Sequence, residues 1–204
     1  MTSPYENKPV EEWSSITDQI VEAHPLETKV IVEVVLDAWD RILSTKIGDK
    51  LQIGVDIFPS PQILGSYLHM LIPVLLCERE SEKWGCGIEK SDKDIIYIPD
   101  DRFSIEIKTS SAKDAIYGNR SYGQENSKNS SGKKKFGYYL AINFEKFSTN
   151  EADFEPIIKQ IKFGWLDHTD WKAQIAATGQ NATLVRNAWL YKMKLLYVMP
   201  PTEF

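Results

Sequence analysis

The stretch KDIIYIPDDRFSIEIKTSS, residues 93–111, contains two apolar segments separated by a turn. Alternating apolar residues predict two strands, DIIYI at 94–98 and FSIEIK at 103–108. The Pro and Asp residues between them are typical of turns. The stretch therefore predicts an antiparallel hairpin.

The register of this hairpin determines which charged side chains meet. With a three-residue loop at 99–101, Asp94 lies opposite Glu106, and Lys108 shares their face. Two carboxylates whose Cβ atoms are about 5 Å apart repel each other unless a cation lies between them, and Mg²⁺ prefers such oxygen ligands. A loop one residue longer would turn Asp94 to the other face. The register predicts a metal site at Asp94 and Glu106; the alternative is a solvated Glu–Lys pair on a half-buried strand.

Asp100 and Asp101 follow Pro99 at the tip of the predicted hairpin. At ~3.3 Å per residue, Asp101 lies roughly 16 Å along the strand from Glu106, too far to share an ion with it. We therefore interpret both tip aspartates as turn residues.

The segments around the hairpin show helical and strand patterns in turn. Apolar residues recur at helical spacing in 28–47, and 60–84 predicts a second helix that is irregular at Pro73. Residues 136–144 and 157–166 are strongly apolar, which predicts two further strands. This order of elements predicts a mixed α/β sheet flanked by helices.

The other segments are less regular. Residues 112–135 are polar, basic and rich in Gly, Ser and Asn, which predicts a long loop with one short helical turn. Residues 167–179 predict a helix that begins at an N-cap, Thr169 or Asp170, and closes at a glycine. Residues 184–198 fit a helix or a strand equally well.

Length and composition suit one globular domain, 1–204, with a mainly helical part at 1–90 and the sheet, loop and C-terminal elements at 91–204. The chain is 42% hydrophobic and 26% charged. Its first residues lack a basic start followed by an apolar run, and the run MLIPVLLC is too short to cross a bilayer. With Cys77 and Cys86 expected as reduced thiols, we expect a cytoplasmic protein.

The net charge of −5 argues mildly against a nucleic-acid partner, but the charge is unevenly distributed. Residues 108–135 contain seven Lys and Arg against two Asp and Glu. One basic surface on an otherwise acidic protein can still bind DNA, so the net charge does not exclude a DNA-binding protein.

Asp94 followed by Glu106-Ile107-Lys108 resembles the active-site signature of the PD-(D/E)xK nuclease superfamily. The superfamily's proline before the aspartate is replaced by Lys93. Four longer runs together resemble type II restriction endonucleases, most nearly the ScaI-type family. These runs are IEIKTSS (105–111), YGNRSYGQ (117–124), GYYLAINFEKF (137–147) and FGWLDHTDW (163–171).

The resemblance implies a restriction-endonuclease-like fold and Mg²⁺-dependent hydrolysis of double-stranded DNA at a palindromic site. It implies Asp94 and Glu106 as metal ligands, the Ile107 carbonyl as a further oxygen, and Lys108 beside the attacking water. A palindromic site implies a homodimer, since each subunit reads one half-site. A cognate DNA methyltransferase is expected in the same system, without a stable complex.

The basic loop contains the candidate DNA contacts. Lysines suit phosphates, whereas Arg and Gln side chains can read base edges. The alternative for its second half is a disordered surface loop. We predict DNA contacts at Arg120, Tyr122, Gln124, Lys133, Lys134 and Lys135.

Glu33, Asp37 and Asp40 form an acidic stripe on the first predicted helix. One acid of this stripe, Glu33, is a further candidate metal ligand; the alternative is a solvated helix face. His168 in DHTDW has no matching nucleophile upstream, so we interpret its segment as a helix start rather than a catalytic site.

Other functions remain open at this point. A structure-specific or repair nuclease would have the same signature but would cut at mismatches, nicks or junctions. A DNA-binding module with an inactive nuclease fold, or a structural α/β domain, would leave the charged set without a reaction. Cleavage of plasmid DNA with Mg²⁺ would distinguish a nuclease from the inactive DNA-binding module and from the structural domain.

Overall fold

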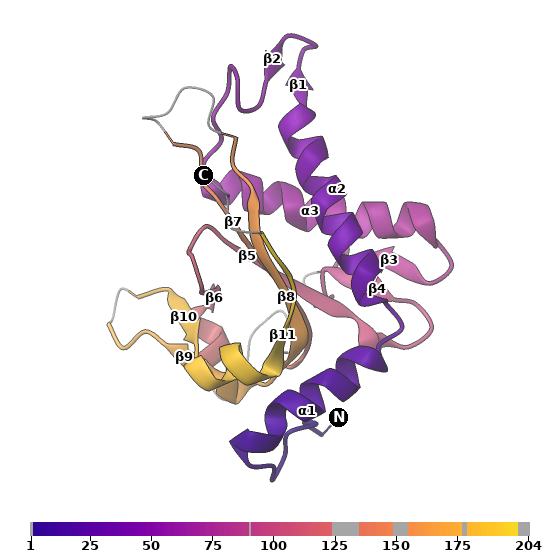
Figure 1. The fold of residues 1–204 in the computed structure, drawn as a ribbon, viewed down its shortest axis with the longest axis vertical. Helices are drawn as coiled ribbons and strands as arrows, with labels where there is room; N and C mark the ends of the chain where they lie inside the picture. Colours follow the sequence, from indigo (N-terminus) through magenta and orange to yellow (C-terminus); the bar gives the residue numbers. More distant parts are fainter. Residues whose placement is uncertain (1, 90, 124–134, 149–154, 177–178, 200–204) are drawn as a thin grey trace.

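The described part of the computed structural model forms a central six-stranded sheet with three α-helices packed against it (Figure 1). The helices are α1 (Val10–Glu22), α2 (Thr28–Ser44) and α3 (Pro61–Arg79). None of the helices in the described part of the chain is long and apolar enough to cross a membrane. The residues that the structure describes are 2–89, 91–123, 135–148, 155–176 and 179–199.

The central sheet has the strand order β11-β8-β7-β5-β4-β3. Only β5 and β7 run parallel among its neighbouring strands; the other pairs are antiparallel, so the sheet is mixed as predicted. The two predicted apolar strands are its central β7 and the adjacent β8. The strands are β3 (Trp84–Cys86), β4 (Ile95–Tyr97), β5 (Ile105–Ser110), β7 (Gly137–Phe144), β8 (Ile158–Leu166) and β11 (Met193–Val198).

Every residue of β7 is buried, because both faces of the sheet are covered. Tyr138, Leu140 and Ile142 face a core shared with the three helices. Tyr139 and Ala141 face a second core on the opposite side. Successive residues of β7 therefore face opposite sides of the sheet, and each residue of β5 faces the same side as the β7 residue that it pairs with.

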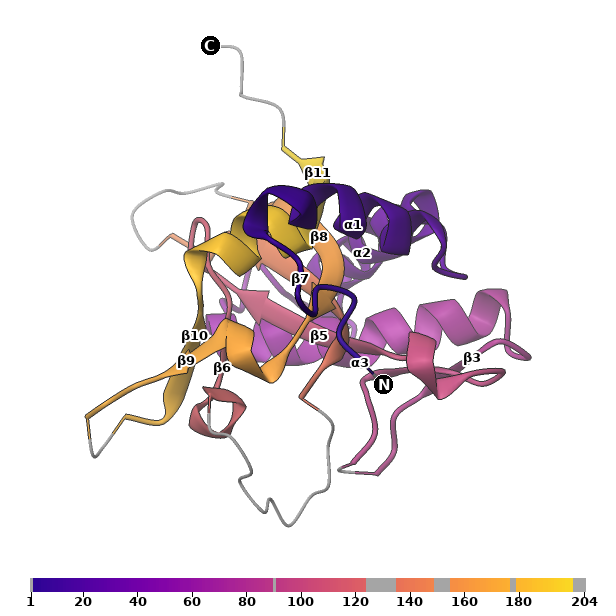
Figure 2. The ribbon, with the colours of Figure 1, turned by 90° about the horizontal axis from the view of Figure 1, so that it is seen from below.

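A small three-stranded sheet, in the order β6-β10-β9, covers the second core. Figure 2 shows α1 and α2 along one side of the central sheet and this small sheet on the other. Its strands are β6 (Tyr117–Asn119), β9 (Trp171–Ala173) and β10 (Asn181–Leu184). A separate hairpin of β1 (Lys46–Ile47) and β2 (Leu51–Gln52) extends from the end of α2.

The predicted hairpin register is confirmed, because Ile95 pairs with Ile105 and the same register places residue 94 opposite residue 106. The strands separate earlier than expected, however. Residues 98–104 form the connection instead of a three-residue loop, and they contain the 3-10 turn η1 (Asp101–Phe103). The predicted connection, 99–101, and the observed one, 98–104, both contain an odd number of residues. Asp94, Glu106 and Lys108 therefore share one face of the sheet in either case.

The hairpin tip confirms the turn interpretation of Asp100. Its carboxylate accepts the Arg102 main-chain N–H at 3.0 Å and forms an ion pair with the Arg102 guanidinium at 2.5 Å. This pair lowers the pKa of Asp100.

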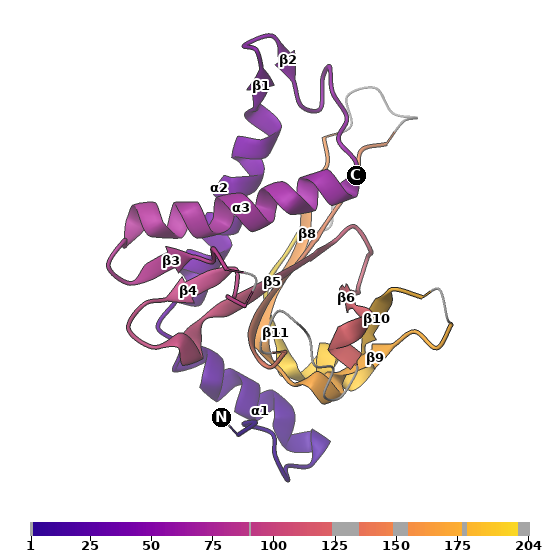
Figure 3. The same cartoon turned by 180° about the vertical axis from the view of Figure 1, so that it is seen from behind.

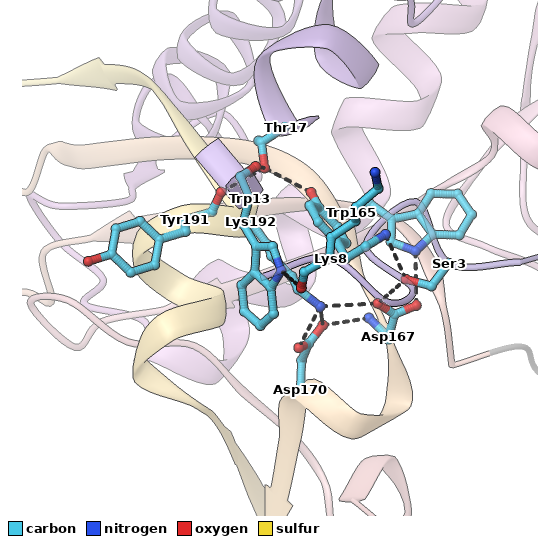
Figure 4. Close-up of polar contacts among 10 residues, drawn as sticks. Ser3, Lys8, Trp13, Thr17, Trp165, Asp167, Asp170, Tyr191 and Lys192 are labelled. Carbon is cyan, nitrogen blue, oxygen red and sulfur yellow. Dashed lines mark hydrogen bonds and ion pairs between the residues drawn. The ribbon is translucent and has the colours of Figure 1, made fainter. Parts of the chain in front are cut away.

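The prediction of a helix at 167–179 is wrong. Only the 3-10 turn η3 (His168–Asp170) forms, and β9 follows it directly. Asp170 accepts the Asp167 N–H at 2.8 Å and is also bound by the buried ammonium of Lys192 at 2.9 Å (Figure 4). Trp171 is then buried in the second core, so tertiary contacts overrode the local helical pattern.

The ambiguous segment 184–198 contains both kinds of structure. The π-helical turn η4 (Ala188–Lys192) leads directly into β11 at the edge of the sheet. Helix α1, which no sequence pattern described above predicts, packs against η4, β8 and β11. The cysteines are free thiols, as expected.

Candidate active site

Glu106 and Lys108 lie on β5, on the face of the central sheet that carries the small sheet. Their neighbours on β7 are Tyr139 and Ala141, which belong to the second core. Lys108 Nζ donates to Glu106 Oε1 at 2.6 Å, and the Glu106 residue is only 2% exposed. The alternative of a solvated surface pair is therefore wrong, because both side chains are covered.

Asp94 immediately precedes β4 and reaches the same place. Its Oδ2 accepts the Ile107 main-chain N–H at 2.6 Å, so its carboxylate lies against the strand between Glu106 and Lys108. The N–H and C=O of one strand residue point to the same side, so the Ile107 carbonyl is directed toward this edge as well. The structure thus brings together the residues that the hairpin register selected.

This donor set fits Mg²⁺. The Asp94 and Glu106 carboxylates and the Ile107 carbonyl are hard oxygen donors, and Mg²⁺ sites commonly use one or two carboxylates together with waters and substrate phosphates. Across the described ranges no group of three or more His, Cys, Asp or Glu side chains could hold a metal by itself. The oxygen donors that this place offers to such an ion are the two carboxylates of Asp94 and Glu106 and the main-chain carbonyl of Ile107.

Helix α3 adds His69, which the sequence did not single out. His69 Nδ1 lies 3.5 Å from Asp94 Oδ2. One turn earlier, a Cβ at Gly65 would lie 2.6 Å from Thr109 Oγ1, so the missing side chain allows α3 to approach β5 closely. A lone histidine on a helix gives no sequence signal, since only this packing brings it to Asp94.

Tyr122 was predicted as a DNA contact, but the structure buries it beside Glu106. Its hydroxyl donates to Glu106 Oε1 at 2.7 Å, and Lys108 Nζ lies 4.9 Å from the centre of its ring. The ring also packs edge-on against Trp171, with centroids 5.2 Å apart. A residue that is 8% exposed and directed into the protein cannot read a base edge as it stands.

Arg120 and Lys135 are also bonded to the protein. Arg120 Nη1 donates to the carbonyls of Ala176 and Gly179 at 3.4 and 3.3 Å. Lys135 Nζ donates to the carbonyl of Ser121, and burial lowers the pKa of Lys135. The other predicted contacts, Gln124, Lys133 and Lys134, lie outside the described residues.

Glu33 is not brought to the site. It forms an ion pair with Arg79 at 3.0 Å, near the end of α3, and a longer one with Lys29 at 3.8 Å. Ten residues of helix, about 15 Å at 1.5 Å per residue, separate Arg79 from His69. The opposite side of α2 is buried in the core, so its acidic stripe is the solvated face that was the alternative.

A polar pocket of about 240 Å³ opens beside Lys108. Its lining residues come from α3, β5 and the small sheet, and Figure 3 shows β5 between α3 and the small sheet. Asn119 and Asn181 line this pocket and are paired directly across β6 and β10. Asn119 belongs to the run YGNRSYGQ, but only the β6–β10 pairing places it beside Asn181. The full lining is His69, Lys108, Thr109, Tyr117, Gly118, Asn119 and Asn181.

Comparison with known proteins shows the family of this chain. The family model described as ScaI restriction endonuclease matches residues 3–198. The type II restriction enzyme ScaI of Streptomyces caespitosus is 45% identical over 183 residues, which cover 89% of this chain and 79% of the relative. No solved structure matches the chain. With nearly its whole length matched by the family model, the chain belongs to the ScaI restriction endonuclease family.

Proposed function

We propose that this protein, a type II restriction endonuclease by its family, hydrolyses both strands of duplex DNA at one palindromic sequence and requires Mg²⁺. The observation that carries the proposal is the convergence of Asp94, Glu106 and Lys108 around the Ile107 main chain. A structure-specific nuclease of the same superfamily is the weaker alternative, because the named relative is a type II restriction enzyme.

The proposed roles follow from the chemistry of each group. Asp94, Glu106 and the Ile107 carbonyl bind the metal through oxygen. The chemistry that such an ion supplies is activation of a water and neutralisation of phosphate charge. Lys108 orients the attacking water and, through its positive charge, favours hydroxide beside the phosphate. Glu106 holds the Lys108 ammonium in reach of this position, since the two side chains are 2.6 Å apart.

For DNA recognition, we assign direct contacts to Asn119 and Asn181 rather than to Tyr122. Both asparagines are exposed, and both line the pocket beside Lys108. An asparagine amide offers a donor and an acceptor together, which suits the edge of an adenine in the major groove. Lys133 and Lys134 remain proposed phosphate contacts, and Arg120 and Gln124 remain proposed base contacts.

The partners follow from the same proposal. One site cuts one strand, and the strands of a duplex are antiparallel, so a symmetric homodimer supplies the second site and reads a palindrome. A methyltransferase of matching specificity would protect the host DNA without forming a stable complex with this protein.

The test is a digest of a plasmid of known sequence, with Mg²⁺ and with EDTA. We expect discrete fragments with Mg²⁺ alone. Lys108→Ala should abolish cleavage and retain DNA binding, because the metal ligands remain. Asp100→Ala is the matched control: its carboxylate is paired with Arg102 at the hairpin tip, so cleavage should persist.

Random fragments, or fragments that form equally in EDTA, would contradict the proposal. Activity in Lys108→Ala together with inactivity in Asp100→Ala would show that the wrong charged residues had been assigned to the site.

A further inference from the structure

Tyr122 makes a contact that DNA binding does not explain, and we propose that it is a positioning residue, one that orients the Glu106 carboxylate for a divalent metal ion. The inference rests on the proposed function, because it concerns the same metal site. It assigns to Tyr122 an effect on metal affinity rather than on base recognition.

The first observation is that two donors bind one oxygen. Tyr122 Oη and Lys108 Nζ both donate to Glu106 Oε1, at 2.7 and 2.6 Å. Two bonds from different directions restrict rotation of the carboxylate about its last torsion. Because Lys108 must also act on the attacking water, a second donor keeps Glu106 oriented when the ammonium turns toward a phosphate.

The second observation is burial. Glu106 is 2% exposed and Tyr122 is 8% exposed, so water contributes little to orienting this carboxylate. Hydrogen bonds to a charged group in such surroundings are stronger than those between neutral groups. The hydroxyl of Tyr122 therefore influences the carboxylate far more than an exposed tyrosine would.

The third observation is that Tyr122 is itself held firmly by the small sheet. A Cβ at Gly118 would lie 3.1 Å from the Tyr122 ring, so this glycine leaves the space that the ring fills. The Arg120 N–H donates to the Gln180 carbonyl at 2.6 Å and ties the 3-10 turn η2 (Arg120–Gly123) to the start of β10. With Trp171 against its edge, the ring has one well-defined position.

The size of the expected effect follows from the kind of contact, a hydrogen bond to a carboxylate proposed to bind metal. Partners of metal-binding carboxylates commonly change metal affinity or activity by about 10- to 100-fold when they are removed. Tyr122→Phe removes only the hydroxyl and keeps the ring contacts with Trp171 and Lys108. It therefore separates the orienting hydrogen bond from the packing of the ring.

The experiment titrates the full-length protein with Mn²⁺ and follows the electron paramagnetic resonance signal of the unbound ion. We expect Tyr122→Phe to bind Mn²⁺ about 10-fold more weakly or worse than wild type. The Mg²⁺ concentration for half-maximal plasmid cleavage should rise in parallel. DNA affinity measured in EDTA and the selected cleavage sequence should not change.

Tyr191→Phe is the control, since Tyr191 is 39% exposed on η4 and lies outside the site. It should match wild type in every measurement. A melting temperature within a few degrees of wild type shows that Tyr122→Phe remains folded. Should it melt much lower, Tyr122→Trp, which keeps an aromatic ring but moves the donor, must also weaken Mn²⁺ binding in its folded state.

Equal Mn²⁺ affinity in wild type and Tyr122→Phe would overturn the inference, whatever the cleavage result. So would a Tyr122→Phe variant that keeps its metal affinity but loses sequence discrimination, because Tyr122 would then act on DNA. A wild type that binds Mn²⁺ tightly and cuts no DNA would instead contradict the proposed function, and the comparison of Mn²⁺ affinities would still decide the role of Tyr122.

Discussion

The proposed role of Asn119 and Asn181 in base recognition rests on the surroundings of these two exposed residues. They are separated by sixty-two positions in sequence, yet they face each other across β6 and β10 and share a pocket with Lys108. The pocket places Lys108, which is proposed to act in hydrolysis, beside two residues able to read a base. Recognition and cleavage would then be neighbours on one surface.

We predict that Asn119→Ala and Asn181→Ala each reduce discrimination between the preferred site and its one-base variants. Loss of one bidentate base contact costs about 1–3 kcal/mol, or about 5- to 150-fold in the ratio of cleavage rates. The measurement is cleavage of duplexes that carry the mapped site or a single changed base pair.

Asn187→Ala is the control for this prediction, because Asn187 is exposed at the start of η4 and does not line the pocket. It should leave the ratio unchanged. If both pocket variants kept wild-type discrimination, base reading would have to be assigned elsewhere in the small sheet or the basic segment.

At the scale of elements, a buried ion cluster joins α1, η3 and η4 (Figure 4). The Lys192 ammonium contacts Asp170 at 2.9 Å and Asp167 at 3.1 Å, and it lies 4.4 Å from the ring centre of Trp13 on α1. Burial raises the pKa of Asp170 even though Lys192 opposes the shift. Burial is thus costly here, and the cluster holds the elements in register only while every charge is paired.

We therefore predict that Lys192→Met destabilises the protein by about 3–5 kcal/mol, because it leaves two covered carboxylates without their cation. Denaturant unfolding at neutral pH measures the change. Adding Asp170→Asn to Lys192→Met should restore part of the loss.

The control is Lys194→Met on β11. Lys194 also reaches α1, through Asp18 at 2.7 Å, but its side chain is 39% exposed and that of Asp18 is 61% exposed. An exposed pair of this kind contributes about 1 kcal/mol or less. Equal destabilisation by the two substitutions would show that burial does not distinguish the pairs.

At the scale of the whole molecule, the described chain presents one Asp94–Glu106–Lys108 set. Cutting both strands in one encounter then needs a second copy related by a two-fold axis. A subunit that dimerises on DNA alone would be a monomer in free solution, so the size of the free protein does not test this mechanism. The ratio of nicked to linear plasmid after cleavage does test it.

We predict that wild-type protein mixed with an excess of Lys108→Ala accumulates nicked circles in place of linear plasmid. Heterodimers on the palindrome would contain one working and one inactive site, and so would cut one strand. The reference is wild type mixed with the same excess of Asp100→Ala, which should still give linear product. A nick-to-linear ratio that the inactive partner never alters would rule out the two-subunit mechanism.

The sequence by itself determined the centre of the molecule. Alternation along DIIYI and FSIEIK and an odd connection were enough to predict the register of β4 and β5, and hence the meeting of Asp94, Glu106 and Lys108. The apolar patterns of α2, α3, β7 and β8 were equally readable. These features are local: the period of side chains along a helix or strand is decided by neighbouring residues.

The tertiary structure alone decided what surrounds that centre. Tyr122 meets Glu106 sixteen residues away in sequence, and Asp170 meets Lys192 twenty-two residues away, so no local pattern marks either pair. The helix predicted at 167–179 does not form, because Trp171 is buried in the second core and β9 pairs with β10. Glu33 was directed away from the site because the other side of α2 supplies the core. Burial and hydrogen bonding between distant segments outweigh weak local preferences, which is why the residues around the hairpin could be assigned only after folding.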